Sequence, residues 1–410
     1  MRRAGTIPSV KEPTHASPQS LPRIPRDPED DYAPQAVAKR LRACQEAAGR
    51  ALPHLEGAPV PPEAARGKVE NLIGYAQVPI GIAGPLEVDT SGGRRSVYVP
   101  MATTEGAMVA SYTRGMKVLG RAGGARARVV AEGLSQHPML VYDDARQALA
   151  AAETIRALEP RFHELVAEVT RHGALSGVDP QPVGRRLVLR LVFTTGDAIG
   201  INMAALASER CSALAAEQTG ARARYLHGED VEKRAHASGL VQGRGRSVVA
   251  DVTVPRAIVE ELLRVTPEDL AAIQKSYAVG FTRLGTKNWL VQSANGLAGV
   301  LLACGQDVAY VAECAMGLLE LEPTPAGDLY ASAWLPTLLV GTVGGGSGQG
   351  TAAECLDLLG VRGEGGGNVF AEILAATVLA GDLSLLASFC AHEFVAAHER
   401  LGRNRPTSAP

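Results

Sequence analysis

Between residues 70 and 399, short apolar segments broken by glycine and proline alternate with long helical patterns. Residues 187–193 and 247–254 are rich in apolar and β-branched side chains, which is typical of buried strands. Apolar residues at helical spacing predict helices over 35–56, 103–120, 144–170, 202–218, 267–283, 291–303 and 367–399. This alternation, with no internal repeat, predicts a mixed α+β enzyme.

Composition excludes several classes of protein. The chain has 410 residues, enough for two or three folded units, and its 41 Lys+Arg nearly balance 43 Asp+Glu. This balance gives no reason to expect binding to nucleic acid or to a membrane surface. Aromatic residues make up only 4%, which disfavours a stacking surface for single-stranded nucleic acid.

The cysteines and the apolar segments indicate the cellular compartment. The six cysteines lie far apart without a Cys-x-x-Cys pair, so we expect no zinc ribbon, redox dithiol or disulfide framework. Arg2-Arg3 is not followed by the apolar core of a signal peptide. Apolar stretches such as 291–302 are too short and too interrupted by glycine to span a bilayer. We therefore expect a cytoplasmic location.

Four segments could bring backbone close to a ligand, and they are residues 71–85, 196–202, 243–247 and 341–350. Residues 196–202 follow the predicted strand at 187–193 and begin a helix, so their amides could hold a phosphate. No complete Gly-x-Gly-x-x-Gly or Walker A motif is present, so an ordinary Rossmann or P-loop site is not indicated. The Gly-Arg-Gly-Arg of 243–246 could meet phosphate or form a solvated turn. The glycine density of 341–350 favours close approach to a dinucleotide or pantetheine.

Three ionisable residues have both a structural and a functional interpretation. Glu105 could lie in the first turn of a helix that is capped by Thr103 or Thr104. Asp307 at the end of an apolar helix would oppose the helix dipole, which hints at a function. His398 could be a simple exposed histidine or could reach a site from a mobile tail. His392 and His398 are six residues apart and lie on different helix faces, so we predict no metal site.

In this order, the segments closely resemble the 3-hydroxy-3-methylglutaryl-CoA (HMG-CoA) reductase family over about residues 70–405. The matching blocks are Glu70-Asn71-Leu72-Ile73-Gly74-Tyr75, Met101-Ala102-Thr103-Thr104-Glu105-Gly106, Gly196-Asp197-Ala198-Ile199-Gly200-Ile201-Asn202-Met203, Cys304-Gly305-Gln306-Asp307 and Gly341-Thr342-Val343-Gly344-Gly345-Gly346. The segment Glu232-Lys233-Arg234, ten residues before Gly243-Arg244-Gly245, resembles the class found in eukaryotes and archaea. Forms without a membrane anchor are the nearer likeness.

The resemblance implies four catalytic residues and a four-electron reduction of HMG-CoA to mevalonate by NADPH. Lys233 would polarise the thioester carbonyl, and Glu105 would donate a proton to the aldehyde-level carbonyl. Asp307 would hydrogen-bond within this cluster, and His398 would protonate the departing CoA thiolate.

The resemblance also implies binding residues. Those for the cofactor are Thr170, Arg171, Asp197, Asn202, Gly344 and Gly345. Arg171 would clamp the adenosine 2′-phosphate, with Arg161 as the alternative, which favours NADPH over NADH. Those for the substrate are Glu70, Tyr75, Arg234, Lys275 and Asn295, with Lys287 as a competitor of Lys275.

The fold that the resemblance implies has a large domain around a long central helix, with an inserted ferredoxin-like cofactor domain. The boundaries we expect are a disordered proline-rich arm at 1–34, a helical segment at 35–69, a large CoA domain at 70–137 and 226–390, an NADP domain at 138–225, and a mobile tail at 391–410. The active site would form between the subunits of a dimer or tetramer.

The end of the pocket that would receive the acyl group departs from the family. Gln136 stands where the family places an arginine against the acyl carboxylate, and Leu226 stands where it has a serine. Arg234 replaces a second lysine, Ala235 replaces a proline, and 238–240 replace Ile-Asn-Trp. Loss of a charged clamp typically costs ~1.5–3 kcal/mol of binding free energy. Three hypotheses stay open: an HMG-CoA reductase, a reductase of another acyl-CoA thioester, and a non-catalytic CoA- or nucleotide-binding paralogue.

Overall fold

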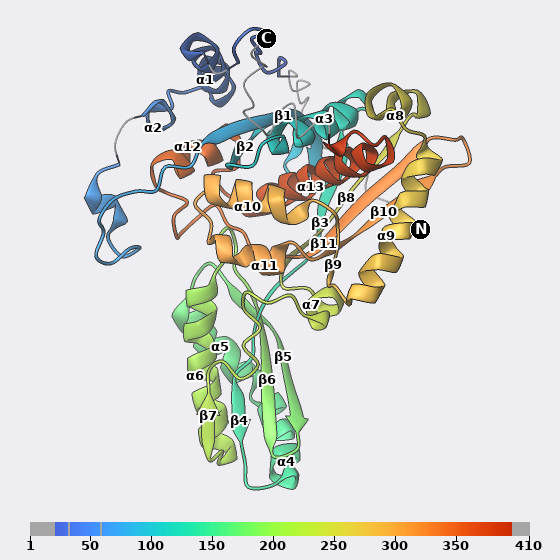
Figure 1. The fold of residues 1–410 in the computed structure, drawn as a ribbon. Helices are drawn as coiled ribbons and strands as arrows, with labels where there is room; N and C mark the ends of the chain where they lie inside the picture. Colours follow the sequence, from blue (N-terminus) through green and yellow to red (C-terminus); the bar gives the residue numbers. More distant parts are fainter. Residues whose placement is uncertain (1–20, 32, 58–59, 396–410) are drawn as a thin grey trace, which may run out of the picture.

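The computed structural model describes residues 21–31, 33–57 and 60–395, which form two lobes (Figure 1). The strands are β1 (Ile80–Thr90), β2 (Gly93–Ala102), β3 (Ala125–Gln136), β4 (Met139–Val141), β5 (Ala174–Val183), β6 (Arg186–Thr194), β7 (Ala223–Tyr225), β8 (Gly245–Val254), β9 (Asn288–Trp289), β10 (Gly317–Pro323) and β11 (Leu329–Leu338). Their order is β7-β4-β6-β3-β8-β11-β10-β9, with β1 beside β2 and β3, and β5 beside β6.

Strand β3 joins the two lobes. Its residues 126–133 pair with β8 in the large lobe, and its last three residues pair with β6 in the small lobe. The small lobe holds β4 to β7 together with the helices α4 (Ala145–Ala157), α5 (Glu159–Val169) and α6 (Ile201–Thr219) (Figure 1). Gln136 therefore ends the strand at the junction of the lobes.

The remaining helices belong to the large lobe and its N-terminal extension. They are α1 (Pro34–Ala48), α2 (Pro53–Glu56), η1 (Pro62–Ala65), α3 (Met108–Arg121), α7 (Ala237–Gln242), α8 (Arg256–Leu263), α9 (Pro267–Leu284), α10 (Ser293–Ala303), η2 (Val308–Tyr310), α11 (Val311–Cys314), α12 (Gly350–Leu358) and α13 (Gly366–Cys390). The mixed α/β character predicted from the sequence is confirmed.

Most predicted helices are present, with four differences, one of which is that the helix predicted over 367–399 ends at Cys390. The prediction of one helix over 144–170 is wrong, because it divides at Leu158 into α4 and α5. Pro160 has no amide N–H to donate to a hydrogen bond that would continue α4, whereas a proline is well tolerated in the first turn of α5. The helix predicted at 103–120 begins only at Met108, and the one predicted at 35–56 is interrupted after Ala48 by Gly49 in a left-handed conformation.

Helix α13 runs through the core of the large lobe (Figure 1). It is long and apolar enough to cross a membrane, but 83% of its most apolar 18-residue window is buried inside the protein. Its packing on α3 is close, since a Cβ added at Gly115 would lie 1.8 Å from the carbonyl oxygen of Ala380. Burial explains its composition, and the expected cytoplasmic location stays a prediction.

Candidate functional site

The Lys233 ammonium and the Asp307 carboxylate form an ion pair, with 2.8 Å between Nζ and Oδ2. Both side chains are slightly less than half exposed, so a ligand can reach them. The prediction that Asp307 ends an apolar helix is wrong, because α10 stops at Ala303 and Asp307 caps the next helix, η2. Its Oδ1 accepts a hydrogen bond from the Ala309 amide at 3.1 Å. The carboxylate therefore faces the favourable end of a helical turn.

A buried polar network lies beneath the Lys233 loop. Arg244 is only 2% exposed and pairs with Glu313 at 2.8 Å and with Glu232 at 3.4 Å. Gln136 donates a hydrogen bond to Glu232 at 2.9 Å, and the hydroxyl of Tyr310 donates to the same carboxylate at 3.2 Å. Both interpretations of the Gly-Arg-Gly-Arg segment, a phosphate contact and a solvated turn, are wrong, because its arginines are buried among protein acceptors.

Glu105 lies in the loop between β2 and α3, next to Asn295 at the start of α10. Asn295 Nδ2 donates to Glu105 Oε1 at 3.4 Å, so the structure brings these two predicted residues together. Thr103 Oγ1 accepts from the Glu105 amide at 3.0 Å. It therefore caps the turn that carries Glu105, whereas α3 starts after Ala107, whose φ is +70°.

The two residues that lead into α10 are held by Asp382, which is buried in α13. Its carboxylate oxygens accept hydrogen bonds from the amides of Val291 at 2.9 Å and Gln292 at 2.8 Å. The hydroxyl of Tyr112 donates to the Gln292 carbonyl at 2.6 Å. Complete burial raises the pKa of Asp382 to about 7, although the two amides act in the opposite direction. Asp382 thus fixes the backbone that presents Asn295.

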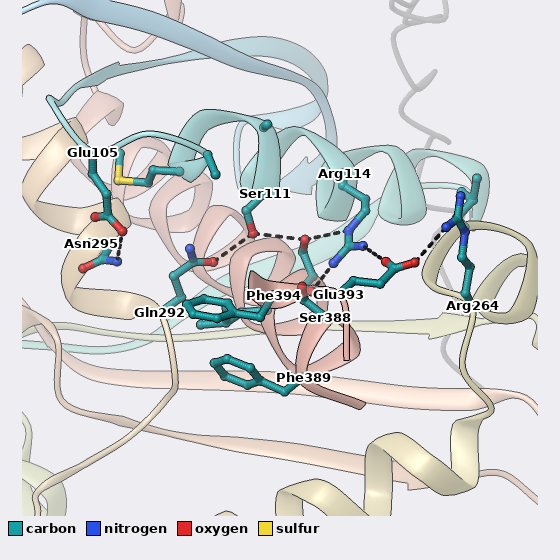
Figure 2. A pocket seen from close by; sticks show the side chains of 16 residues that line it. Glu105, Ser111, Arg114, Arg264, Gln292, Asn295, Ser388, Phe389, Glu393 and Phe394 are labelled. Carbon is teal, nitrogen blue, oxygen red and sulfur yellow. Dashed lines mark hydrogen bonds and ion pairs between the residues drawn. The ribbon is translucent and has the colours of Figure 1, made fainter. Parts of the chain in front are cut away.

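A cleft of about 600 Å³ extends along α3 from Glu105 and Asn295 to Arg114 and Arg264 (Figure 2). Its apolar wall includes Met108, Leu385, Phe389 and Phe394. At the far end, Glu393 lies between the two guanidiniums, 3.5 Å from Arg114 and 2.7 Å from Arg264 (Figure 2). The cleft therefore joins a carboxylate, an apolar wall and a pair of cations, which suits a long ligand with an anionic end.

The turn at 195–200 is attached to the large lobe. Asp197 accepts hydrogen bonds from the amides of Gly365 at 3.1 Å and Gly367 at 2.7 Å. Arg246 donates to the Val340 carbonyl at 2.7 Å and also to the Gly196 carbonyl. Both carboxylate oxygens of Asp197 thus accept hydrogen bonds at the start of α13 and connect the two lobes. The predicted contact of Asp197 with the cofactor would have to be made by this same carboxylate.

The glycine-rich loop lies against this turn, since Ala198 and Val343 form a parallel bridge. Gly344 and Gly345 have φ angles of +85° and +55°, and a Cβ at either would meet no atom within 4 Å. Asn202, in the first turn of α6, is exposed. The structure therefore brings three predicted cofactor residues to one open region at the junction of the lobes.

Arg171 and Arg161 differ in their ion-pair partners. Arg171 is exposed just after α5, and within the described part of the chain it has no ion-pair partner. Arg161 instead pairs with Glu164. Thr170 ends α5 and accepts the His172 amide at 3.0 Å.

Several predicted substrate residues do not meet the Lys233–Asp307 pair through any contact among the described residues. Glu70 and Tyr75 lie in an exposed segment between η1 and β1 that extends from the large lobe (Figure 1). Lys275 is exposed on α9, Lys287 is half-buried, and Arg234 pairs with Asp230 at 2.6 Å. His398 lies outside the described residues.

Sequence reasoning missed Tyr310, Glu313, Glu232 and the structural role of Arg244. The spacing Asp307-x-x-Tyr310-x-x-Glu313 was a usable signal, because residues three apart share one face of a tight helix. Among residues 21–31, 33–57 and 60–395, no group of three His, Cys, Asp or Glu side chains could hold a metal ion.

Comparison with known proteins gives a consistent result. The family model described as hydroxymethylglutaryl-coenzyme A reductase matches residues 36–403. The reductase of Methanothermobacter thermautotrophicus is 39% identical over 373 residues, covering 90% of this chain and 94% of that protein. The reductase of Haloferax volcanii is 40% identical over 375 residues, covering 90% and 93%.

A solved structure has the same fold. The class II 3-hydroxy-3-methylglutaryl-CoA reductase from Streptococcus pneumoniae, bound to NADPH in open conformations, superposes with a TM-score of 0.71 at 20% identity. The match covers 86% of this chain and 96% of that one. With the family model spanning the site and archaeal relatives near 40% identity, the chain belongs to the hydroxymethylglutaryl-CoA reductase family.

Proposed function

We propose that this protein catalyses the NADPH-dependent reduction of HMG-CoA to mevalonate and CoA. The observation that carries the proposal is the accessible Lys233–Asp307 ion pair, within a chain that belongs to this family. An ammonium held by a carboxylate is a suitable electrophile for a thioester carbonyl, because it stabilises the negative charge that develops on oxygen.

Each proposed catalytic residue has a defined task. Lys233 donates a hydrogen bond to the carbonyl oxygen, and Asp307 orients its ammonium. Glu105, positioned by Asn295, donates a proton to the oxygen at the aldehyde level. His398 protonates the CoA thiolate as it leaves.

The residues at the lobe junction fit NADPH. Open space beside Gly344 and Gly345 lets a planar ring approach the backbone. The guanidinium of Arg171, which has no ion-pair partner among the described residues, suits a 2′-phosphate. When bound, NADPH supplies the hydride, and reduction of one thioester to an alcohol consumes two of them. The small lobe, within residues 138–225, is the proposed cofactor domain, and residues 70–137 and 226–390 form the proposed CoA domain.

We assign the cleft along α3 to coenzyme A. Arg114 and Arg264 at its far end suit phosphate groups, and the apolar wall suits the pantetheine arm. The reacting thioester would then lie near Glu105 and Asn295, at the other end of the same cleft (Figure 2).

We also propose a dimer or tetramer whose active site is completed by a second subunit. Glu70 and Tyr75 are exposed in the segment before β1, and Ile73 between them is fully exposed. An apolar side chain this accessible next to predicted substrate residues favours contact with another copy of the chain.

The test measures loss of NADPH absorbance with HMG-CoA together with release of free thiol. We expect two NADPH consumed per thiol, and no turnover by Lys233→Ala that still binds NADPH. A folded wild type that binds NADPH but reduces no thioester would contradict the proposal and favour the binding-protein hypothesis.

A reductase of another acyl-CoA is the second candidate, favoured by the environment of Gln136. This side chain is only 1% exposed and donates to Glu232, so it offers no positive charge to an acyl carboxylate. Comparison of kcat/KM for HMG-CoA with that for neutral acyl-CoA thioesters decides between the two. A clear preference for HMG-CoA removes this candidate.

A further inference from the structure

Lys233 adopts a backbone conformation that a lysine rarely takes. Its φ is +59°, in the left-handed region where the Cβ crowds the backbone. A residue keeps such a strained backbone conformation only when several surrounding contacts hold it there, and such residues cluster at active sites. The contacts that hold this backbone therefore decide where the ammonium points.

One contact holds the backbone of Lys233 directly. Its amide donates a hydrogen bond to Oε1 of Glu313, whose side chain is completely buried. The other oxygen of Glu313 accepts from Arg244 at 2.8 Å, and Arg244 also donates to the Ser135 carbonyl at 3.1 Å. The acceptor for the Lys233 amide is thus fixed to β3 through a buried guanidinium.

Two further contacts hold the ammonium of the same lysine. Asp307 pairs with Nζ, and the ring of Tyr310 lies beneath it with 5.1 Å between Nζ and the ring centroid. The Tyr310 hydroxyl donates to Glu232, which fixes the ring. Asp307, Tyr310 and Glu313 follow one another at intervals of three along η2 and α11.

This spacing places the three side chains on one helical face, where they contact one lysine at both its ends. The face itself is anchored, because Thr337 donates to the Glu313 carbonyl at 2.7 Å. The charged and polar groups that face Glu313 are Arg244, Glu232 and the Lys233 amide. Burial is the largest influence on the carboxyl group and raises the pKa of Glu313, whereas Arg244 acts in the opposite direction.

We propose that Glu313 and Tyr310 are positioning residues that hold Lys233 in its reactive geometry. Glu313 acts through the backbone amide and Tyr310 through the ammonium. The inference rests on the proposed function, since it assigns these residues to the lysine that polarises the thioester.

The test compares Glu313→Leu, which removes the acceptor, with Glu313→Gln, which keeps an acceptor oxygen. A misplaced catalytic group can cost about a hundredfold in rate, so we expect Glu313→Leu to lower kcat by about that factor with little change in KM. Glu313→Gln should recover part of the loss. Tyr310→Phe keeps the ring and should retain more activity than Tyr310→Leu.

A matched control separates positioning from stability. Glu354 is also a buried carboxylate that accepts two backbone amides, those of His54 and Leu55, but it lies under α2. We expect Glu354→Gln to lower the melting temperature and leave kcat unchanged. Equal loss of kcat in Glu313→Leu and Glu354→Gln would overturn the proposal.

A second measurement does not depend on activity. With lysine-selective ¹⁵N labelling, hydrogen exchange of the Lys233 amide should be about tenfold or more faster in Glu313→Leu than in the wild type, because exchange requires the hydrogen bond to open. An unchanged exchange rate would refute the role of Glu313. If the wild type fails to reduce HMG-CoA, the proposed function fails, while this measurement still decides whether Glu313 holds Lys233.

Discussion

At the scale of single residues, the cations of the candidate site are already paired with carboxylates of the same chain. Lys233 has Asp307, Arg244 has two carboxylates, and the cations at the far end of the cleft share Glu393. A ligand phosphate that enters between Arg114 and Arg264 meets a carboxylate already in place. Glu393 therefore competes with the phosphate for the same donors.

Removal of this carboxylate should strengthen coenzyme A binding. Exposed ion pairs are worth little, so we expect Glu393→Gln to lower the Kd for CoA by about threefold, with a weaker response at high salt. Calorimetric titration at two ionic strengths measures it. Arg264→Gln is the control and should raise the Kd, whereas an equal Kd for Glu393→Gln and the wild type would show that the phosphates bind elsewhere.

The candidate site was only partly predictable from the sequence, and the residue scale shows why. Glu105, Lys233 and Asp307 stand in short continuous sequence blocks, which can be recognised without knowledge of the fold. Glu313 and Arg244 are paired across 69 residues of chain, and nothing local indicates that their charges are buried together. Asp197 was assigned to the cofactor from its block, yet its carboxylate accepts amides from the start of α13. A motif fixes residue types, whereas burial and partners come from tertiary contacts.

At the scale of elements, α13 supports both α3 and α10. It carries Asp382, which holds the two residues that lead into α10, and it packs on α3 at distances that exclude a side chain at Gly115. The helices were largely predictable because their periodic apolar patterns are strong. Among the described strands only β6 and β8 were predicted, since strands such as β1 and β5 contain glycine and proline that weaken the strand pattern. The tight helix contact was not, since a glycine in a helical pattern does not reveal what lies against it.

Stability should depend on pH through Asp382. Its folded-state pKa, raised by burial to about 7, exceeds the ordinary 3.8, so the folded protein retains a proton that the unfolded chain releases. The contribution of Asp382 to stability is therefore fully present below about pH 4 and is lost as pH rises towards 7. Because one pKa unit is worth ~1.4 kcal/mol, the advantage of the wild type over Asp382→Asn should shrink by about 4 kcal/mol across this window. Urea unfolding at several pH values measures it, and a constant difference would contradict the assignment.

Two glycine-to-alanine substitutions should change the stability of the fold in opposite directions, one in the α3–α13 contact and one outside it. Gly115→Ala should destabilise the fold by about 3 kcal/mol or more, because its Cβ would overlap the Ala380 carbonyl. Gly280→Ala in α9 is the control, where the new Cβ meets no atom within 4 Å. It should stabilise the protein by up to about 1 kcal/mol through helix propensity. Thermal unfolding distinguishes them, and a stable Gly115→Ala would mean that the two helices are not in close contact.

At the scale of the whole molecule, the exposed segment before β1 stands out because it makes little contact with the rest of the described chain. It carries predicted substrate residues but, within the described chain, Tyr75 makes only a long hydrogen bond of 3.5 Å to Pro61. The β3 strand and the Asp197 contacts already connect the two lobes within the chain, so the proposed contact with a second copy concerns only this outer side.

Ile73→Asp tests the assembly. We expect it to shift the protein towards the monomer, because a charge buried in an interface is costly. The loss of the shared site should lower kcat by about tenfold or more. Light scattering after size-exclusion chromatography gives the molar mass. Val183, which is also well exposed but lies in the small lobe, supplies the control Val183→Asp, with mass and activity unchanged. Full activity in a monomer would contradict a shared site.

The burial of α13 has a consequence for how this chain is made. The strands that the helix contacts, β1, β3, β8 and β11, are all synthesised before it, and their apolar faces stay uncovered until it arrives. The small lobe, by contrast, is built from one continuous stretch of chain from β4 to β7 and can fold as soon as it leaves the ribosome. The lobe proposed to bind the cofactor is thus complete early, whereas the large lobe closes its core only after α13 has been synthesised.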